Sequence, residues 1–231
     1  MTDDLDNKVI QAQADLRRVL EQRYSSNGAF LAHKFMSDSE APELEIENTM
    51  NSRILPERRY ILPHLPQECI FAEVGTQTGA FAKVILDSLN PKELHIIDID
   101  YSYFNFQWAN SYLTKKQLIQ HTGDSSNILS QFPDNYFDVI YIDADHSYTS
   151  VTKDLVQAEL KIKPEGWIIC NDYTCWSPLE VTKYGVYRAV NEFCLSKEWG
   201  IQFIALHKWG YHDVALKHIN HPHFHDSLSI Q

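Results

Sequence analysis

Apolar and polar positions alternate in two different ways along this chain. From residue 69 onward, short runs of mostly apolar residues recur, separated by stretches whose apolar residues stand three or four positions apart. Runs of the first kind are typical of buried β-strands, and stretches of the second kind of amphipathic helices. We predict strands at residues 69–74, 94–100, 118–121, 137–143, 166–172, 201–206 and 214–218. We predict helices that begin at residue 80 and span residues 103–113, 126–132, 148–160 and 185–199.

This alternation predicts an α/β domain. Strands that are apolar along their whole length are buried on both faces, as in a parallel sheet covered by helical crossovers. The seventh strand follows the sixth without a helix between them, so we expect it to return beside the sixth. In open sheets of this kind ligands bind beyond the carboxyl ends of the strands. The residues just after each strand are therefore the candidates for chemistry.

The first 60 residues follow a different pattern. Residues 3–24 have apolar side chains at helical spacing and predict a helix. Residues 25–60 are mixed, with an acidic stretch around Pro42 and a small basic cluster that includes Arg58. We divide the chain into a helical N-terminal extension, an α/β domain and a His-rich tail, and the extension is a candidate lid or oligomerisation element. These three parts span residues 1–60, 61–217 and 218–231.

Composition and charge narrow the function classes. The 231 residues have an ordinary globular balance, but 31 acidic residues against 20 Lys and Arg give a net charge of −11, which disfavours binding to nucleic acid. No apolar run approaches the ~20 residues of a membrane span, and the start lacks a signal-peptide pattern. The four cysteines are too scattered for a disulfide framework. We expect a cytoplasmic protein that acts on a small molecule, with no nucleic-acid or membrane partner.

A glycine-containing loop follows the first predicted strand. Glu73 ends the strand, and Gly75 and Gly79 enclose Thr76 and Gln77 before a helix. Glycine lets the backbone turn sharply and approach a ligand, and the helix N-terminus offers free N–H groups. The loop lacks the G-x-G-x-x-G pattern of dinucleotide sites, because Gln77 occupies the second glycine position. The alternative is an ordinary strand-to-helix turn.

Acidic residues follow the second and third predicted strands. Asp98 lies 23 residues after Gly75, where an acidic side chain binds the ribose hydroxyls in nucleotide-binding βαβ units. Asp124 and Ser125 follow the third strand, and Asp124 is a candidate acceptor for an exocyclic amine. Both aspartates have an alternative role as a helix N-cap, which Asp favours.

The fourth and fifth predicted strands end in a dense polar block. Asp143, Asp145 and His146 follow a very apolar strand, and Asn171 and Asp172 end the next one. If these strands are neighbours, the oxygen-rich side chains converge and suit Mg²⁺ or Mn²⁺. The same groups are candidate bases that activate a nucleophile. A network of hydrogen-bonded helix caps is the alternative.

The C-terminal tail holds a second candidate metal site. His221, His223 and His225 alternate, so they would lie on one face of an extended chain. Imidazoles arranged in this way are typical zinc ligands. A solvated tail without a metal is the alternative.

Taken together, these residues resemble class I S-adenosylmethionine-dependent methyltransferases. The most specific segments are residues 137–155, 163–173 and 185–193, which resemble the small-molecule branch that contains macrocin O-methyltransferase-like enzymes. The resemblance covers residues 68–216. It implies a Rossmann-like, seven-stranded sheet whose last strand is antiparallel, with helices on both faces.

By the same resemblance, S-adenosylmethionine would bind along the carboxyl ends of the strands. The loop from Glu73 through Gly79 would border its methionine part, Asp98 its ribose, and Asp124 with Ser125 its adenine. Asp143 would face the methyl group, next to a bound Mg²⁺. Metal-dependent members have two aspartates where this chain has Asn171 and Asp172, so one charge is missing from the predicted metal set of Asp143, Asn171 and Asp172.

The resemblance implies transfer of a methyl group to a hydroxyl, or to an amine, of a small molecule. Asp143, His146 and Asp145 are the candidate bases, because the acceptor must lose its proton. The family also implies a homo-oligomer. Two other functions stay open: a nucleotide-binding oxidoreductase, and a cofactor-binding protein without turnover.

Overall fold

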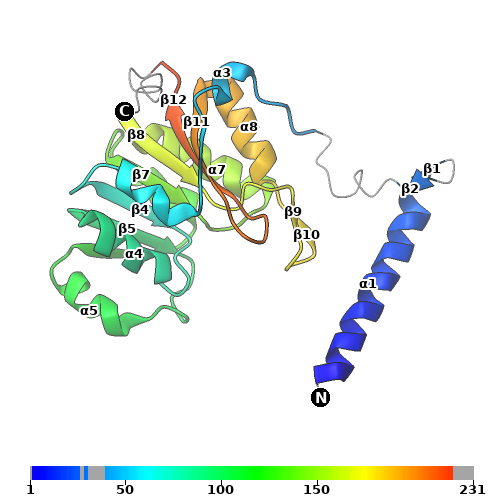
Figure 1. The fold of residues 1–231 in the computed structure, drawn as a ribbon. Coiled ribbons are helices and arrows are strands. Elements are labelled where there is room, and N and C mark those ends of the chain that lie inside the picture. The colour runs from blue at the N-terminus through cyan, green and yellow to red at the C-terminus, as the bar shows by residue number, and fades with distance from the viewer. Residues whose placement is uncertain (1, 27–28, 31–39, 221–231) are drawn as a thin grey trace. The chain divides into compact units, whose positions relative to one another are not determined.

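The computed structural model describes residues 2–26, 29–30 and 40–220. The chain separates into two compact units, Met1–Glu40 and Ala41–Gln231. The first unit contains the helix α1 (Thr2–Tyr24) and the short antiparallel strands β1 (Ser25–Ser26) and β2 (Ala29–Phe30). The predicted N-terminal helix is confirmed (Figure 1). None of the described helices combines the length and the apolar character that crossing a membrane requires.

The second unit contains the α/β domain. Its helical elements are α3 (Ile46–Thr49), the 3-10 turns η1 (Arg58–Tyr60) and η2 (Leu62–His64), α4 (Ala80–Leu89), α5 (Phe106–Thr114), α6 (Ser125–Ser130), α7 (Tyr148–Lys161) and α8 (Val186–Lys197). Its strands are β3 (Arg53–Leu55), β4 (Ile70–Val74), β5 (Glu93–Asp98), β6 (Leu118–Thr122), β7 (Phe137–Ile142), β8 (Ile162–Cys170), β9 (Trp176–Ser177), β10 (Thr182–Lys183), β11 (Trp199–Ala205) and β12 (Asp213–His218).

The strands of the main sheet run mostly parallel. Among the described residues it has eight strands in the order β3-β11-β12-β8-β7-β4-β5-β6. β12 is antiparallel to both of its neighbours, β8 and β11. The predicted seven strands and the antiparallel last strand are therefore confirmed. β7 and β5 lie on opposite sides of β4, so the chain reverses its direction of travel at the centre of the sheet, where open α/β sheets bind ligands.

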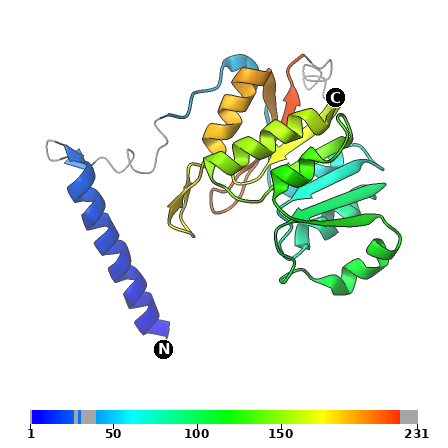
Figure 2. The same ribbon diagram turned by 180° about the vertical axis from the view of Figure 1, so that it is seen from behind.

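Helices cover both faces of this sheet (Figures 1 and 2). One buried cluster joins α4, α5 and η2 to the sheet through residues such as Ile85, Ala109 and Leu62. A second cluster joins α6, α7 and α8 to the other face, with Leu155 and Val190 among its members. The apolar runs that predicted the strands are thus buried on both sides, as a parallel sheet requires.

The strand β3 adds an eighth member at one edge of the sheet. It pairs in parallel with β11, and Leu55 lies opposite Ala205. The segment before it is anchored to β11 by side chains: Asn48 Nδ2 donates to the Trp199 carbonyl at 2.8 Å, and Ser52 Oγ donates to the Ile201 carbonyl at 2.7 Å. Part of the segment assigned to the N-terminal extension, residues 41–60, therefore packs within the second unit.

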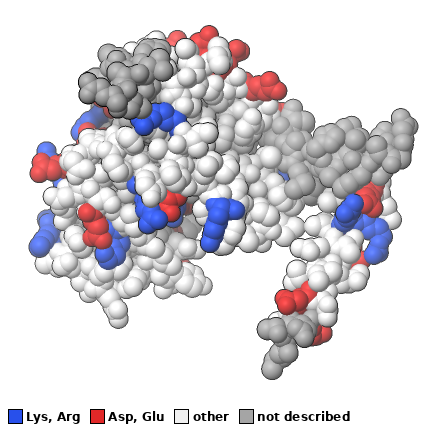
Figure 3. Space-filling view, in the orientation of Figure 1, with Lys and Arg blue, Asp and Glu red and all other residues white. Residues whose placement is uncertain are grey.

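Two segments go beyond the predicted elements. β8 begins at Ile162 and runs through Pro164, earlier than the predicted start at residue 166. The stretch between Trp176 and Tyr184 carries the antiparallel hairpin β9–β10. On the face seen in Figure 3, acidic and basic side chains are interspersed among neutral ones.

Candidate active site

The loop after β4 approaches the end of β7 so closely that it requires glycine. Gly75 has a φ of 84°, and a Cβ there would overlap the carbonyl group of Asp143. Gly79 has a φ of 75°, and a Cβ there would overlap the ring of Phe104. A side chain at either position is therefore excluded by both conformation and space. The result is a backbone cradle at the centre of the sheet.

Asp98, at the end of β5, holds this cradle in shape. One oxygen of its carboxylate accepts hydrogen bonds from the N–H groups of Thr76 at 2.9 Å and Gln77 at 2.8 Å. Gln77 has a φ of 46°, which turns the loop toward that carboxylate. The second oxygen accepts a longer bond of 3.2 Å from the Asp100 N–H. The structure thus places Asp98 beside the loop, at the position predicted for a ribose contact.

Two buried polar groups beside the cradle have atoms without a partner. Glu73 is 2 % exposed, and its Oε2 forms no hydrogen bond. Thr76 is also buried, and its Oγ1 forms no hydrogen bond either. Burial raises the pKa of the Glu73 carboxyl well above its usual range, and the neighbouring Asp143 raises it further. A buried carboxyl without a partner is costly. A bound cation would offset that cost.

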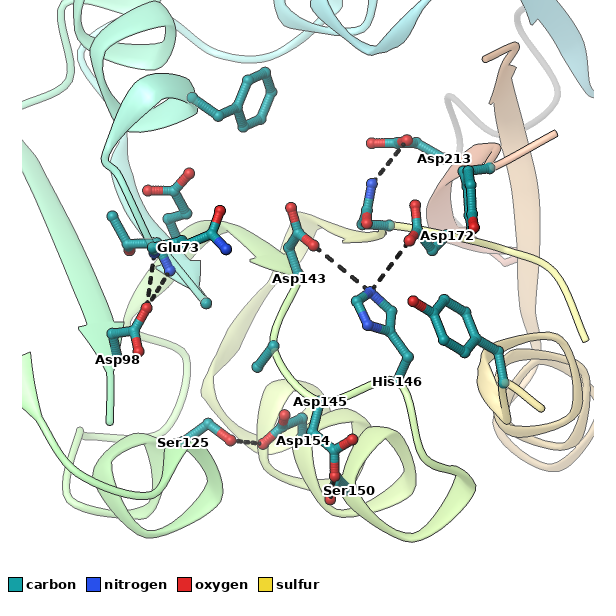
Figure 4. A pocket seen from close by; sticks show the side chains of 18 of the residues that line it. Glu73, Asp98, Ser125, Asp143, Asp145, His146, Ser150, Asp154, Asp172 and Asp213 are labelled. Atoms are coloured by element: carbon teal, nitrogen blue, oxygen red, sulfur yellow. Dashed lines mark hydrogen bonds and ion pairs between the residues drawn. The ribbon is translucent and has the colours of Figure 1, made fainter. Parts of the chain in front are cut away.

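His146 stands between two carboxylates from adjacent strands (Figure 4). Its Nε2 lies 3.6 Å from Asp143 Oδ1 and 3.5 Å from Asp172 Oδ2, and it has no hydrogen-bond partner. The Tyr184 ring stacks on the imidazole, with 4.5 Å between centroids and 6° between planes. The Gly185 N–H donates to the His146 carbonyl at 2.8 Å. The stacked Tyr184 ring and the backbone hydrogen bond from Gly185 therefore fix the position of the imidazole.

The two carboxylates control the protonation of this imidazole. Burial lowers the pKa of His146, but Asp143 and Asp172 raise it more, so the pKa lies above its usual value. Burial raises the pKa of Asp172 to about 6, although His146 opposes that shift. His146 is thus a stronger base than an ordinary histidine, with counter-charges ready to stabilise its protonated form.

Two of the predicted site residues are engaged as helix caps. Asp145 turns toward the first turn of α7 and accepts from the hydroxyls of Ser147 at 2.8 Å and Ser150 at 2.6 Å. Asp124 is the N-cap of α6 and accepts from the Asn127 N–H at 3.0 Å. These hydrogen bonds lower the pKa of both carboxyls. The structure therefore brings Asp124 and Asp145 to the cavity wall in the capping role given as the alternative.

Ser125 has a partner that sequence reasoning missed. Its hydroxyl donates to Asp154 Oδ1 at 2.6 Å, and Asp154 Oδ2 is buried without a partner. Asp154 is 1 % exposed, and burial raises its pKa to about 6. It lies in α7 between Val151 and Leu155, on the buried face of the helix. The sequence signal that could have identified Asp154 is an acidic residue on the otherwise apolar face of a predicted helix.

A second network that the sequence analysis missed lies at the other end of the cavity. Arg58 Nη1 donates to the Tyr141 hydroxyl at 2.8 Å and lies 3.3 Å from Asp143 Oδ2. The Tyr141 hydroxyl donates to Asp213 Oδ2 at 2.6 Å, and Asn171 Nδ2 donates to Asp213 Oδ1 at 3.1 Å. Burial raises the pKa of Asp213 to about 7. Side chains from η1, β7, β12 and the residue after β8 are thus connected to one another.

Replacement of Tyr141 by Phe tests the strength of this network. We expect the free energy of unfolding to fall by about 1–3 kcal/mol, because Asp213 loses a buried donor and Arg58 an acceptor. Tyr148→Phe is the matched control: its hydroxyl donates to Glu192 at the protein surface, so we expect a change below about 0.5 kcal/mol. Urea unfolding measures both. Equal losses in the two variants would contradict a special role for the Tyr141 network.

The predicted metal ligands Asp143, Asn171 and Asp172 do not form a cation site. The Asn171 amide is turned toward Asp213, and the imidazole of His146 occupies the space between the two carboxylates. In residues 2–26, 29–30 and 40–220, no three His, Cys, Asp or Glu side chains are grouped to hold a metal ion. These contacts within the described residues give no support to Mg²⁺. The predicted zinc site at residues 221–225 lies outside the described residues.

Most of these groups line one cavity of about 1090 Å³ at the carboxyl edge of the parallel strands, whereas Tyr141 and Gly79 lie behind its lining. The glycine loop, Asp98 and the Ser125–Asp154 pair form one end of it. His146 with its carboxylates lies in the middle, and the exposed side chains of Leu179, Leu206 and Trp209 lie at the rim. The cavity thus combines a backbone cradle with exposed apolar side chains, and Glu180 and His207 line it next to them.

This fold and site match known proteins. Residues 72–173 match the model of a family described as a methyltransferase domain. The second unit has the fold of a methyltransferase domain. The match runs from the middle of β4 to just beyond β8, so it includes the glycine loop, Asp98, His146 and Asp172. No curated protein matches the sequence.

Solved structures share this methyltransferase fold at low identity. The pyocyanin biosynthetic protein PhzM has a TM-score of 0.52 and 14 % identity, over 68 % of this chain and 53 % of that chain. The trans-methyltransferase CalH in complex with SAH has a TM-score of 0.50 and 12 % identity, over 68 % and 53 %. Fibrillarin from Aeropyrum pernix, with natively bound S-adenosyl-L-methionine, has a TM-score of 0.50 and 10 % identity, over 65 % and 67 %. The matched region spans about half the length of the first two proteins.

Proposed function

We propose that this chain is an S-adenosylmethionine-dependent methyltransferase that methylates a hydroxyl group of a small apolar molecule. One observation carries the proposal. His146 stands with an unpartnered Nε2 between Asp143 and Asp172, in the same cavity as the glycine cradle. A base for the acceptor and a cradle for the cofactor therefore line one cavity.

The polar end of the cavity fits the cofactor. When bound, S-adenosylmethionine supplies a methyl group on a positively charged sulfonium, which needs no further activation. Glu73 has a buried carboxyl oxygen that lacks a partner, and a neighbouring ammonium group would stabilise its ionised form. Asp98 has lone pairs left to accept from ribose hydroxyls. The cofactors bound in fibrillarin and CalH support this assignment.

His146 is the proposed base. An acceptor hydroxyl that reaches the cavity centre would donate to Nε2, the atom without a partner. The imidazole would take the proton of this hydroxyl, and Asp143 and Asp172 would stabilise the imidazolium. The stacked Tyr184 keeps the ring in place during this transfer. No metal is needed to lower the pKa of the acceptor.

The rim of the cavity indicates an apolar acceptor. Leu179, Leu206 and Trp209 are exposed there, and the rings of Tyr184 and Tyr211 pack behind them. Apolar side chains around a few fixed polar groups are typical of small-molecule sites. The resemblance of residues 137–155 to macrocin O-methyltransferase-like enzymes supports a hydroxyl as the acceptor.

Two measurements test this proposal. Calorimetric titration of the full chain should detect binding of S-adenosylmethionine and of S-adenosylhomocysteine, but not of a nicotinamide dinucleotide. Transfer of radiolabelled methyl groups should then be screened over hydroxylated aromatic and aliphatic compounds, with EDTA and with Mg²⁺. We expect equal rates under both metal conditions. No cofactor binding would overturn the methyltransferase assignment, and activity lost in EDTA would overturn the metal-free mechanism.

A further inference from the structure

The helix α1 carries a regular stripe of exposed apolar side chains. Its members are Leu5, Val9, Ala12, Leu16 and Val19. They follow one another at intervals of four, three, four and three residues, an average of 3.5, and all are exposed. A strict 3.5-residue repeat keeps one seam turned toward a partner helix in a left-handed coiled coil. Helices that pack on a globular core have a wider apolar face with a 3.6-residue period.

We propose that this stripe binds α1 of a second copy of the chain in an antiparallel, two-stranded coiled coil. In heptad positions, Val9 and Leu16 are a residues, and Leu5, Ala12 and Val19 are d residues. Antiparallel pairing places Leu5 of one helix against Leu16 of the other, and Val9 against Ala12. The same surface serves both copies, so the contact closes on itself as a two-fold dimer.

The charges beside the stripe select this orientation. Lys8 and Asp15 occupy the g positions that flank the seam. In an antiparallel pair, g positions face each other, so Lys8 of each copy meets Asp15 of the other and two opposite-charge pairs form. In a parallel pair, g faces e, so Lys8 would meet Gln13 and Asp15 would meet Leu20, without any ion pair. Charge complementarity therefore favours the antiparallel second copy.

Within one chain these charged groups have only weak partners. Lys8 Nζ lies 2.7 Å from Asp4, and Asp15 lies 2.6 Å from Arg18, in exposed pairs along the same helix. Exposed ion pairs of this kind contribute little to the free energy of folding. Lys8 and Asp15 can therefore exchange these partners for partners on a second helix at little cost. The seam is short, and only two of its members, Leu5 and Leu16, are leucines. We therefore expect a dimer that dissociates on dilution.

Sedimentation velocity of the full chain over a concentration series tests the proposal. We expect a dimer at about 50 µM that dissociates at low micromolar concentration. The double variant Val9→Asp/Leu16→Asp should be monomeric at every concentration. The control Gln11→Asp/Ala14→Asp adds the same charges on the opposite side of the helix and should stay dimeric. A monomeric wild-type chain, or a Val9→Asp/Leu16→Asp variant that still dimerises, would overturn the proposal.

A charge exchange tests the orientation. Lys8→Asp and Asp15→Lys each create like-charge pairs in the antiparallel dimer and should weaken it at least threefold. The combined exchange Lys8→Asp/Asp15→Lys restores opposite pairs and should recover most of the affinity. If the combined exchange does not recover the affinity of the dimer, the antiparallel register is excluded. Far-UV circular dichroism and urea unfolding of each variant show that the chain is still folded. Because neither measurement involves a cofactor, this result stays independent of the methyltransferase assignment.

Discussion

His146→Gln is expected to lower the rate constant of methyl transfer by about three orders of magnitude, since general-base catalysis contributes about 10²–10⁴. Gln preserves a polar side chain of similar reach but accepts no proton at neutral pH. Cofactor affinity should stay within about threefold of wild type, because His146 lies away from the glycine cradle. Single-turnover transfer from labelled S-adenosylmethionine separates the two effects.

The pH profile provides the second readout for His146. The base must be neutral to accept a proton, and its pKa lies above the usual value, so activity should rise with pH through a limb on the alkaline side of 6.5. Asp172→Asn removes a counter-charge and should move that limb toward acid by about one pH unit. Asp145→Asn, at a carboxylate that hydrogen-bonds to Ser147 and Ser150, is the control and should move the limb less than Asp172→Asn does. An unchanged profile in His146→Gln would contradict its role as the base.

Asp98→Ala is expected to weaken S-adenosylmethionine binding by at least about 100-fold. The carboxylate accepts two N–H groups of the cradle, and bonds to charged groups contribute about 1.5–3 kcal/mol each. The substitution also removes the proposed acceptor for the ribose hydroxyls. Calorimetric titration measures the loss directly.

Asp100→Ala is the matched control for Asp98. Asp100 lies two residues further along the chain, but its exposed carboxylate bonds only to Ser102. We expect its cofactor affinity to stay within about twofold of wild type. If both variants lose affinity equally, the effect comes from the general negative charge of the cavity, and Asp98 has no specific contact.

The strands could be predicted because burial on both faces leaves a strong signal. Runs such as residues 70–74 and 137–142 are almost wholly apolar, and both are central strands of the sheet. β3 left no such signal: it lies at the edge, and of its three residues only Leu55 is buried. Its place depends on pairing with β11, a contact across some 150 residues of sequence.

The candidate site was predictable in position but not in detail. The glycine loop, Asp98, Asp143 and His146 follow parallel strands, so the rule about carboxyl ends finds them. Asp213 escapes that rule because β12 runs antiparallel, so its first residue, not its last, lies at the functional edge. Whether an aspartate at a strand end caps a helix, as Asp145 does, or faces the cavity depends on side-chain rotation, which sequence spacing does not encode.

The position of β12 also bears on how the protein is made. β12 inserts between β8 and β11, and therefore completes the sheet only after both of its neighbours have been synthesised. Until residues 213–218 leave the ribosome, the edges of β8 and β11 have no strand between them and Asp213 is missing from the network with Tyr141. A nascent chain therefore has the glycine loop and Asp98 well before Asp213 joins the cavity. Emergence of β12, and not emergence of the glycine loop, is therefore the event that completes the site.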